Sequence, residues 1–253
     1  MKNTIKENRL FLLFILIVGL IGGYFVGLYQ YDSYTMSSDI INQLIGQGIT
    51  REKLAIISTV QSGLYALLFG VFGIMLSQKT GLWKHFKLEK MPLGITTVLS
   101  VFGALLLFPV DKLVFGSFSE WVNSSYASEP TIEKFISGVT YGGVIEEVIM
   151  RLFLMSLLSF LIYKVFYKNE RELPTRVFII ANLATTLLFA AGHLPYTMSV
   201  TTLTPVVVTR CFIMNGSIGL LFGYLYRKYG IGYAMLSHAL CHIISGITMF
   251  IFL

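Results

Sequence analysis

The sequence predicts an all-α fold, a polytopic transmembrane helical bundle of about seven spans. Of its 253 residues, 55% are hydrophobic and only 13% are charged, and the mean hydropathy is +0.74. Soluble domains carry about 25% charged residues, so lipid rather than water is the expected solvent for most of this chain. Long apolar runs alternate with short basic connections. Together these observations predict an integral, multi-pass membrane protein.

Seven apolar stretches are long enough to cross a bilayer, which takes about 20 residues. The fourth is too long for one ordinary span, because its 35 residues reach about 52 Å at about 1.5 Å per residue. It is either a tilted helix that protrudes from the membrane or an interfacial turn followed by a span, so eight segments are the alternative. The seven stretches cover residues 10–29, 54–78, 92–116, 132–166, 177–197, 203–226 and 231–253.

Basic residues predict the orientation, because cytoplasmic loops carry an excess of Lys and Arg. Every second connection is basic, which places the N-terminus in the cytoplasm and the C-terminus outside, and we expect a bacterial cell membrane. The net charge of +6 therefore indicates topology and lipid contact, with no nucleic-acid partner. Lys and Arg number 3, 4, 4 and 2 in residues 1–9, 79–91, 164–176 and 227–230, against 2, 0 and 0 in 31–53, 117–131 and 198–202.

The chain contains no recognisable soluble domain. Its first apolar run is longer than the 7–15 residues or so of a signal peptide, so we interpret it as a retained helix. Cys211 and Cys241 fall within apolar runs and do not indicate a disulfide framework. We expect N-terminal helices and loops over residues 1–131 and a helical core over 132–253.

Three ionisable residues interrupt the fourth apolar stretch: Glu146, Glu147 and Arg151. Charges at bilayer depth are costly and usually face a protein interior or a water-filled cavity. Glu147 and Arg151 are four residues apart on one helical face and can neutralise each other. Glu146 is about 140° round an α-helix from Arg151, so it needs a partner from another helix. Gly142 and Gly143, one turn earlier, would admit another backbone or a substrate.

Three histidines in other apolar runs are the candidate partners. His193 ends the sequence Phe189-Ala-Ala-Gly-His193, and His238 and His242 project from one face of the last helix. A single intramembrane histidine most simply has a structural role. Three of them on two helices, with an unmatched glutamate on a third, predict a shared site. Glutamate with histidine can bind a metal or hold and deprotonate a water molecule.

Other polar residues in the apolar runs favour packing roles. An aspartyl mechanism needs two membrane-embedded aspartates, and only Asp111 lies near such a depth. Ser217 lies among small residues that usually mark close helix packing. Arg210 either pairs with a carboxylate elsewhere in the bundle or meets a substrate carboxylate. Asn182 and Gln61 are interpreted as groups that hydrogen-bond between helices.

The order of these motifs resembles that of a known family. Glu146-Glu147-x-x-x-Arg151, Phe189-x-x-x-His193 and His238-x-x-x-His242 follow one another over residues 132–250. They are similar to the motifs of the intramembrane proteases grouped as type II CAAX prenyl endopeptidases and bacteriocin-processing enzymes. This family is also called abortive-infection-like, or CPBP. One position departs from the pattern, because His242 stands where the family usually has Asn or Asp.

The resemblance implies hydrolysis of a peptide bond in a membrane-associated protein or peptide. Glu146 would be the general base and His193 would orient the water, with His238 and His242 completing the site and Glu147–Arg151 fixing the helix. Zinc or another divalent metal held by Glu146, His193 and His238 is one implied mechanism, and a metal-free, Glu/His-activated water is the other.

Two other functions fit the same residues. One is an ion- or proton-coupled transporter, in which the glutamates and histidines form a relay. The other is a non-catalytic membrane immunity or adaptor protein that retains the fold, which His242 makes worth considering.

Overall fold

The predicted all-α membrane fold is confirmed. The computed structural model describes residues 2–35, 38–126, 131–170 and 172–252, and within these ranges every regular element is a helix. Seven helices are long and apolar enough to cross a membrane, which makes the chain an integral multi-pass membrane protein. They run over Arg9–Tyr34, Arg51–Thr80, Lys90–Phe118, Ile132–Phe166, Thr175–Val200, Pro205–Tyr229 and Ile231–Ile251.

The long helices begin and end at residues whose chemistry favours a helix boundary. The Thr50 hydroxyl accepts a hydrogen bond from the Lys53 N–H at the start of one long helix, and Gly81 ends that helix with a positive φ of 71°. Thr204 caps another helix in the same way, and Gly230 follows its last residue with a φ of 95°. The elements are α1 (Lys2–Glu7), α2 (Arg9–Tyr34), α3 (Ser38–Gly46), α4 (Arg51–Thr80), α5 (Lys90–Pro109), η1 (Val110–Phe115), α6 (Gly116–Phe118), α7 (Glu120–Ser125), α8 (Ile132–Ser137), η2 (Gly138–Glu146), η3 (Val148–Met155), α9 (Ser156–Phe166), α10 (Thr175–Gly192), α11 (Leu194–Val200), α12 (Pro205–Tyr229) and α13 (Ile231–Phe252).

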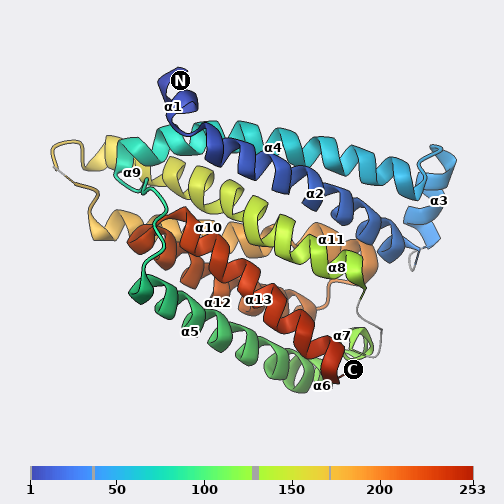
Figure 1. Cartoon of the computed structure of the whole chain (residues 1–253). Coiled ribbons are helices and arrows are strands. Elements are labelled where there is room, and N and C mark those ends of the chain that lie inside the picture. Colours follow the sequence, from blue (N-terminus) through green and yellow to red (C-terminus); the bar gives the residue numbers. More distant parts are fainter. Residues whose placement is uncertain (1, 36–37, 127–130, 171, 253) are drawn as a thin grey trace.

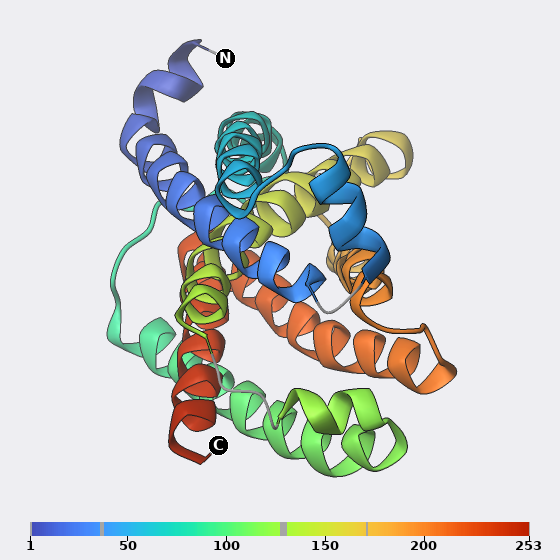
Figure 2. The ribbon, with the colours of Figure 1, turned by 90° about the vertical axis from the view of Figure 1, so that its right-hand side faces the viewer.

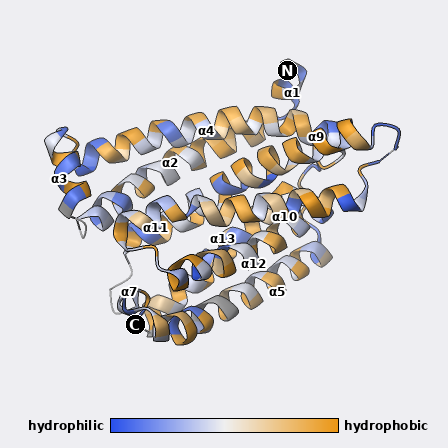
Figure 3. Cartoon of the chain, turned by 180° about the vertical axis from the view of Figure 1, so that it is seen from behind, coloured by the Kyte–Doolittle hydropathy of each residue, from blue (hydrophilic) through white to orange (hydrophobic). Residues whose placement is uncertain are grey.

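The long helices lie side by side, and the short helices α1, α3, α7 and α11 lie towards the two ends of the bundle (Figure 1). Seen from one end, α2 and α4 lie on one side and α5 on the opposite side (Figure 2). Apolar residues cover most of the long helices, and polar residues gather in the end regions (Figure 3). Large side chains such as Leu64, Leu68 and Phe102 are more than half exposed, as expected for a surface that faces lipid.

The fourth span is one continuous helix, so the eight-segment alternative is wrong. It runs through α8, η2, η3 and α9 without a turn, and its central part is π-helical rather than α-helical. Charged residues lie near both ends of this helix, Glu133 and Lys134 in α8 and Lys164 in α9. Its excess length therefore extends into the polar regions on either side, as the protruding-helix interpretation requires.

This fourth span lies at the centre of the packing. It contacts α2 and α4 on one side and α13 on another, while α10 and α12 pack against η3. Its side chains Ile145, Val148, Leu152 and Met155 are completely buried in the main apolar core. Charged groups on the buried face of its central part, such as Glu147 and Arg151, are therefore shielded from water and depend on protein partners.

Candidate intramembrane active site

The predicted site residues on the fourth span lie on π-helical turns. Glu146 is the last residue of η2, Glu147 joins η2 to η3, and Arg151 lies within η3. A π-helix is bonded from residue i to i+5, and single π turns occur frequently at functional sites. The wider turn also changes which side chains share a face, so the α-helical angle expected between Glu146 and Arg151 does not apply here.

Glu147 and Arg151 form the buried pair that their spacing predicted. The Arg151 Nη1 donates to Glu147 Oε1 at 2.9 Å, and their side chains are 1% and 0% exposed respectively. Arg151 Nη2 also donates to the Gly219 carbonyl of α12 at 3.0 Å. The guanidinium lies over the rings of Phe189 and Phe222, 4.7 and 5.4 Å from their centroids. Arg151 is thus held by an acid, a carbonyl and two aromatic faces.

His238 is oriented by the same carboxylate. Its Nδ1 lies 2.9 Å from Glu147 Oε1, which already accepts a hydrogen bond from Arg151. Because this oxygen acts as an acceptor, Nδ1 carries the proton and the neutral ring has its lone pair on Nε2. One face of the ring stacks on Phe222 with centroids 4.4 Å apart, and His242 stacks at 5.0 Å. A buried hydrogen bond of 2.9 Å between Ser237 and Ser100 fixes the preceding residue. The orientation of the His238 ring is therefore well determined.

Glu146 faces the unprotonated nitrogen of this ring. Its Oε2 lies 4.0 Å from His238 Nε2, and its side chain is 24% exposed, whereas Glu147 is fully buried. The separation is too long for a direct hydrogen bond but suits one water molecule at about 2.8 Å from each atom. Glu146 thus lies opposite a partner on another helix, as expected, although the α-helical angle on which that expectation rested does not apply here. Of the two glutamates it is the accessible one.

His193 lies at the end of α10, close to the same rings. Its Nδ1 is 2.8 Å from the Phe189 carbonyl, which can only accept, so Nδ1 carries the proton. The Phe189 ring touches both histidines, with centroids 4.8 Å from His193 and 6.1 Å from His238. These contacts place His193 beside the His238 ring.

His242 occupies a slot between glycines of the fourth span. A Cβ at Gly138 would lie 2.7 Å from His242 Nδ1, and one at Gly142 would lie 2.8 Å from Nε2. The next glycine, Gly143, packs against the backbone of Ala239 in α13, where a Cβ would lie 2.9 Å from Cα. Of the two roles expected for the glycine pair, the structure shows the close approach of another backbone.

The predicted metal set is not assembled as such. In both His193 and His238 the Nδ1–H donates to a fixed acceptor, which leaves Nε2 unprotonated, a common arrangement for zinc ligands. However, among the described residues no three His, Cys, Asp or Glu side chains come close enough together to hold a metal ion. A catalytic zinc takes three protein ligands, so Glu146, His193 and His238 as arranged do not fit it. Zinc remains a prediction of the resemblance.

The remaining polar residues show a second charged cluster away from this site. Arg210 makes a bidentate pair with Asp111 of η1, and Tyr126 donates to the same carboxylate at 2.7 Å. Of the two interpretations of Arg210, pairing within the bundle is the one observed. Asn182 bonds the Leu220 carbonyl of another helix as predicted. The prediction for Gln61 was wrong, because it bonds Tyr65 of its own helix.

Ser217 and two residues overlooked in the sequence complete the description. The Ser217 hydroxyl bonds the Ile213 carbonyl one turn back, but the residue is exposed, so the close helix packing expected around it is not observed at Ser217. The Gly219 carbonyl and the Phe222 ring were overlooked as supports of Arg151 and His238. A backbone carbonyl leaves no sequence signal, and Phe222 is one of 20 phenylalanines. Only the position of α12 against η3 identifies them.

The comparison with protein families agrees with the motif pattern. The profile described as type II CAAX prenyl endopeptidase Rce1-like matches residues 129–244, which include all six predicted site residues. The comparisons with curated proteins and with solved structures gave no match.

Proposed function

We propose, from the match of residues 129–244 to the type II CAAX prenyl endopeptidase Rce1-like family, that this chain is an intramembrane endopeptidase. Its substrate would be a membrane-associated protein or peptide of CAAX type or bacteriocin-like type. The family match supports a protease that acts on a protein in the bilayer. The mechanism and the division of roles below are our proposal.

The observation that carries the proposal is the pairing of Glu146 with His238. One water molecule would bridge Glu146 Oε2 and His238 Nε2, which are 4.0 Å apart. Both atoms accept hydrogen bonds, so the water would donate both of its hydrogens and direct a lone pair towards a peptide carbonyl carbon. A carboxylate and an imidazole fixed in this way would raise the nucleophilicity of that water.

The reaction would proceed without a covalent enzyme intermediate. As the water oxygen bonds to the carbonyl carbon, its proton passes to Glu146 and a tetrahedral oxyanion forms. When the C–N bond breaks, Glu146 returns this proton to the departing amine. The products are a carboxylic acid, which ionises, and a free amine, so the glutamate ends as it began.

The other predicted site residues would support the reaction at Glu146 and His238. Glu147 and Arg151 would hold the His238 ring in the tautomer that presents an unprotonated Nε2, through the hydrogen bonds at 2.9 Å. His242 would supply an N–H to the oxyanion, as the amide of Asn would in the usual family pattern. His193 would orient the water or the peptide from the end of α10.

Cleavage of a defined peptide tests the proposal. Purified protein in detergent or nanodiscs is given a fluorogenic CAAX-type peptide, farnesylated or not, and a bacteriocin-like leader peptide. We expect Glu146→Gln to lower kcat by about 10²–10⁴-fold, the range of general base catalysis, without loss of folding. Glu120→Gln, which changes an exposed carboxylate of α7, is the matched control and should cleave like the wild type.

Two further measurements separate the alternatives. If the wild type cleaves none of the peptides but Glu146 controls proton or ion flux in liposomes, the transporter alternative replaces this proposal. If the Glu146→Gln variant inserts normally and keeps the biological phenotype, the adaptor alternative replaces the protease proposal. Metal analysis of the purified wild type against His193→Ala decides on zinc, since a bound stoichiometric metal lost in the variant would support a metal-dependent mechanism.

A further inference from the structure

We infer that Gly22 of α2 and Gly73 of α4 are positioning residues, which hold the π-helical segment around Glu146 and Glu147 through direct contact with its backbone. Both glycines precede residues 129–244, so they lie outside the part of the chain that the family profile matches. The inference rests on the proposed function for its catalytic meaning. The contacts themselves are independent of it.

Gly22 brings α2 against the backbone of η2. A Cβ at Gly22 would lie 2.8 Å from the Tyr141 nitrogen and 2.9 Å from the Thr140 hydroxyl oxygen. Real Cβ atoms are essentially never found this close to a backbone atom. A backbone nitrogen cannot move aside as a flexible side chain can, so any larger residue at this position must displace η2 or α2.

Gly73 makes the corresponding contact from α4 to η3. A Cβ at Gly73 would lie 2.7 Å from Leu152 Cγ and 2.9 Å from both the carbonyl carbon and the carbonyl oxygen of Leu152. Leu152 is fully buried and directly follows Arg151. A displacement here would therefore act on the residue that is paired with Glu147.

The two contacts are placed evenly about the glutamates. Tyr141 is five residues before Glu146, and Leu152 is five residues after Glu147. Five residues are one hydrogen-bonded turn of a π-helix. Gly22 and Gly73 thus touch the backbone one π turn before the first glutamate and one π turn after the second.

The opposite side of the segment is held by α13. There Gly143 packs against the backbone of Ala239, one residue after His238. The segment is gripped between α2 and α4 on one side and the helix that carries His238 on the other. π-helical turns are rare, and uncommon backbone conformations persist where their surroundings fix them. A shift of one residue in register would turn Glu146 away from His238.

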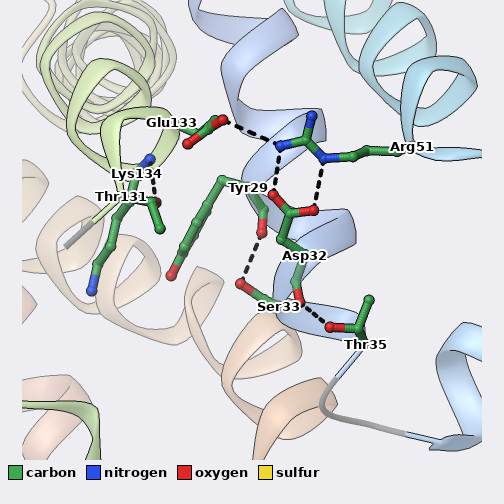
Figure 4. Close-up of polar contacts among 8 residues, drawn as sticks. All are labelled: Tyr29, Asp32, Ser33, Thr35, Arg51, Thr131, Glu133 and Lys134. Carbon is green, nitrogen blue, oxygen red and sulfur yellow. Dashed lines mark hydrogen bonds and ion pairs between the residues drawn. The ribbon is translucent and has the colours of Figure 1, made fainter. Parts of the chain in front are cut away.

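An ion-pair network joins the same elements at one end of the bundle (Figure 4). Arg51 at the start of α4 donates two hydrogen bonds of 2.7 Å to Asp32 of α2 and one of 3.2 Å to Glu133 of α8. Glu133 lies in the first turn of the same continuous helix that carries η2 and η3. The N-terminal helices are therefore attached to this helix by charges at its start and by glycines along its length.

A neighbouring glycine provides the control. Gly27 also lies in a close contact of α2, but with Ala55 and Leu54 of α4 and not with the fourth span. Changing it should weaken the packing of α2 on α4 and leave η2 untouched. Gly94 of α5 has nothing within 4 Å of a built Cβ, so it reports the effect of alanine alone.

The experiment compares four alanine variants in the full chain: Gly22→Ala, Gly73→Ala, Gly27→Ala and Gly94→Ala. For Gly22→Ala and Gly73→Ala we expect kcat to fall by about 10²-fold with KM unchanged, because small displacements of catalytic groups have effects of this size. We also expect faster amide hydrogen exchange in residues 138–155. Gly27→Ala should lower the thermal midpoint with kcat of the folded protein kept, and Gly94→Ala should change neither.

The outcomes are separable from those of the proposed function. If the wild type cleaves peptides and Gly22→Ala and Gly73→Ala keep kcat within twofold, the inference is overturned while the protease proposal stands. Loss of kcat in Gly27→Ala to the same degree would also overturn it, since a general packing effect would then explain the result. If the wild type is inactive, hydrogen exchange still decides, because unchanged exchange at 138–155 in both variants contradicts the positioning role.

Discussion

Two buried clusters of acids and bases lie on π-helical turns of this bundle, one around Asp111 and one around Glu147. In the first, Arg210 pairs with Asp111 through two hydrogen bonds and Tyr126 donates to the same carboxylate. In the second, Arg151 pairs with Glu147, but a second glutamate and two stacked imidazoles lie beside them. In the first cluster the Asp111 carboxylate is paired with the Arg210 guanidinium, whereas the second contains a glutamate beyond the one that Arg151 pairs with.

This difference separates structural charges from a candidate for chemistry. A buried pair that is matched and hydrogen-bonded mainly fixes the relative positions of two helices. An ionisable group in excess at membrane depth is costly, so it usually marks a functional site. Glu146 is that group, because Glu147 alone accounts for the charge of Arg151. Substitutions in one cluster or the other should therefore differ in their effects on stability and on kcat.

Replacing Arg151 by Met should have the largest effect. The change leaves Glu147 buried without its base, for which the expected cost is about 3–5 kcal/mol. It also releases the hydrogen-bonded carboxylate that fixes His238, so cleavage should be lost even in molecules that fold. The free energy of unfolding in detergent and kcat at a permissive temperature measure the two effects. Full activity in the folded fraction would contradict the role assigned to the pair.

Replacing Arg210 by Met should lower the free energy of unfolding by less than the Arg151 change does, and it should leave kcat unchanged. The Arg210 side chain is 24% exposed, so water can partly solvate Asp111 once the pair is broken. Loss of its hydrogen bonds to a charged group predicts a cost of about 1.5–3 kcal/mol. Asp111→Asn is the matched variant from the other side of the pair. Both variants should keep kcat per folded molecule, and a marked loss of kcat would mean that this cluster takes part in catalysis.

Two substitutions of His242 should have intermediate effects on activity. His242→Asn keeps an N–H donor in the glycine slot and should retain cleavage within about tenfold, at a cost of about 0.5–1.5 kcal/mol for the lost stacking. His242→Phe keeps a ring but no donor, and removal of an oxyanion donor is expected to lower kcat by about 10²–10³-fold. Equal activity of the two variants would exclude His242 as a donor.

Ser217→Ala should have the smallest effect. The hydroxyl only bonds its own helix, and such exposed positions change stability by about 0.5 kcal/mol or less. Cleavage should be unaffected, measured with the same peptides. A large loss of activity would instead mean that the Ser217 hydroxyl takes part in catalysis.

The spans and one charged pair were predictable from the sequence because they depend on local pattern. Apolar length identifies a membrane helix, and a spacing of four residues brought Glu147 and Arg151 together. The partner of Glu146 on another helix was also expected, but the basis of that expectation, an α-helical angle to Arg151, does not hold in the π-helical segment. The N-terminal orientation and the bacterial membrane stay predictions, as does the division of the chain at residue 131.

Contacts between distant spans could not be predicted in the same way. Nothing in the local sequence connects Arg210 with Asp111. Gln61 donates a hydrogen bond to Tyr65 of its own helix and not to a neighbouring helix. The π-helical turns were also overlooked, because residue types do not fix the hydrogen-bond register of an apolar helix. The position of His193 beside His238 likewise depends on a ring that both contact, Phe189, and the local sequence does not show it.

The slot that holds His242 links three positions in the evolution of this chain. Its imidazole and the missing methyl groups of Gly138 and Gly142 compete for one volume. The smaller side chain of Asn at position 242 would leave room for alanine at these glycines, whereas the imidazole of His242 leaves none. We therefore expect residues 138, 142 and 242 to covary among relatives, so that acquiring histidine requires both glycines to be in place first.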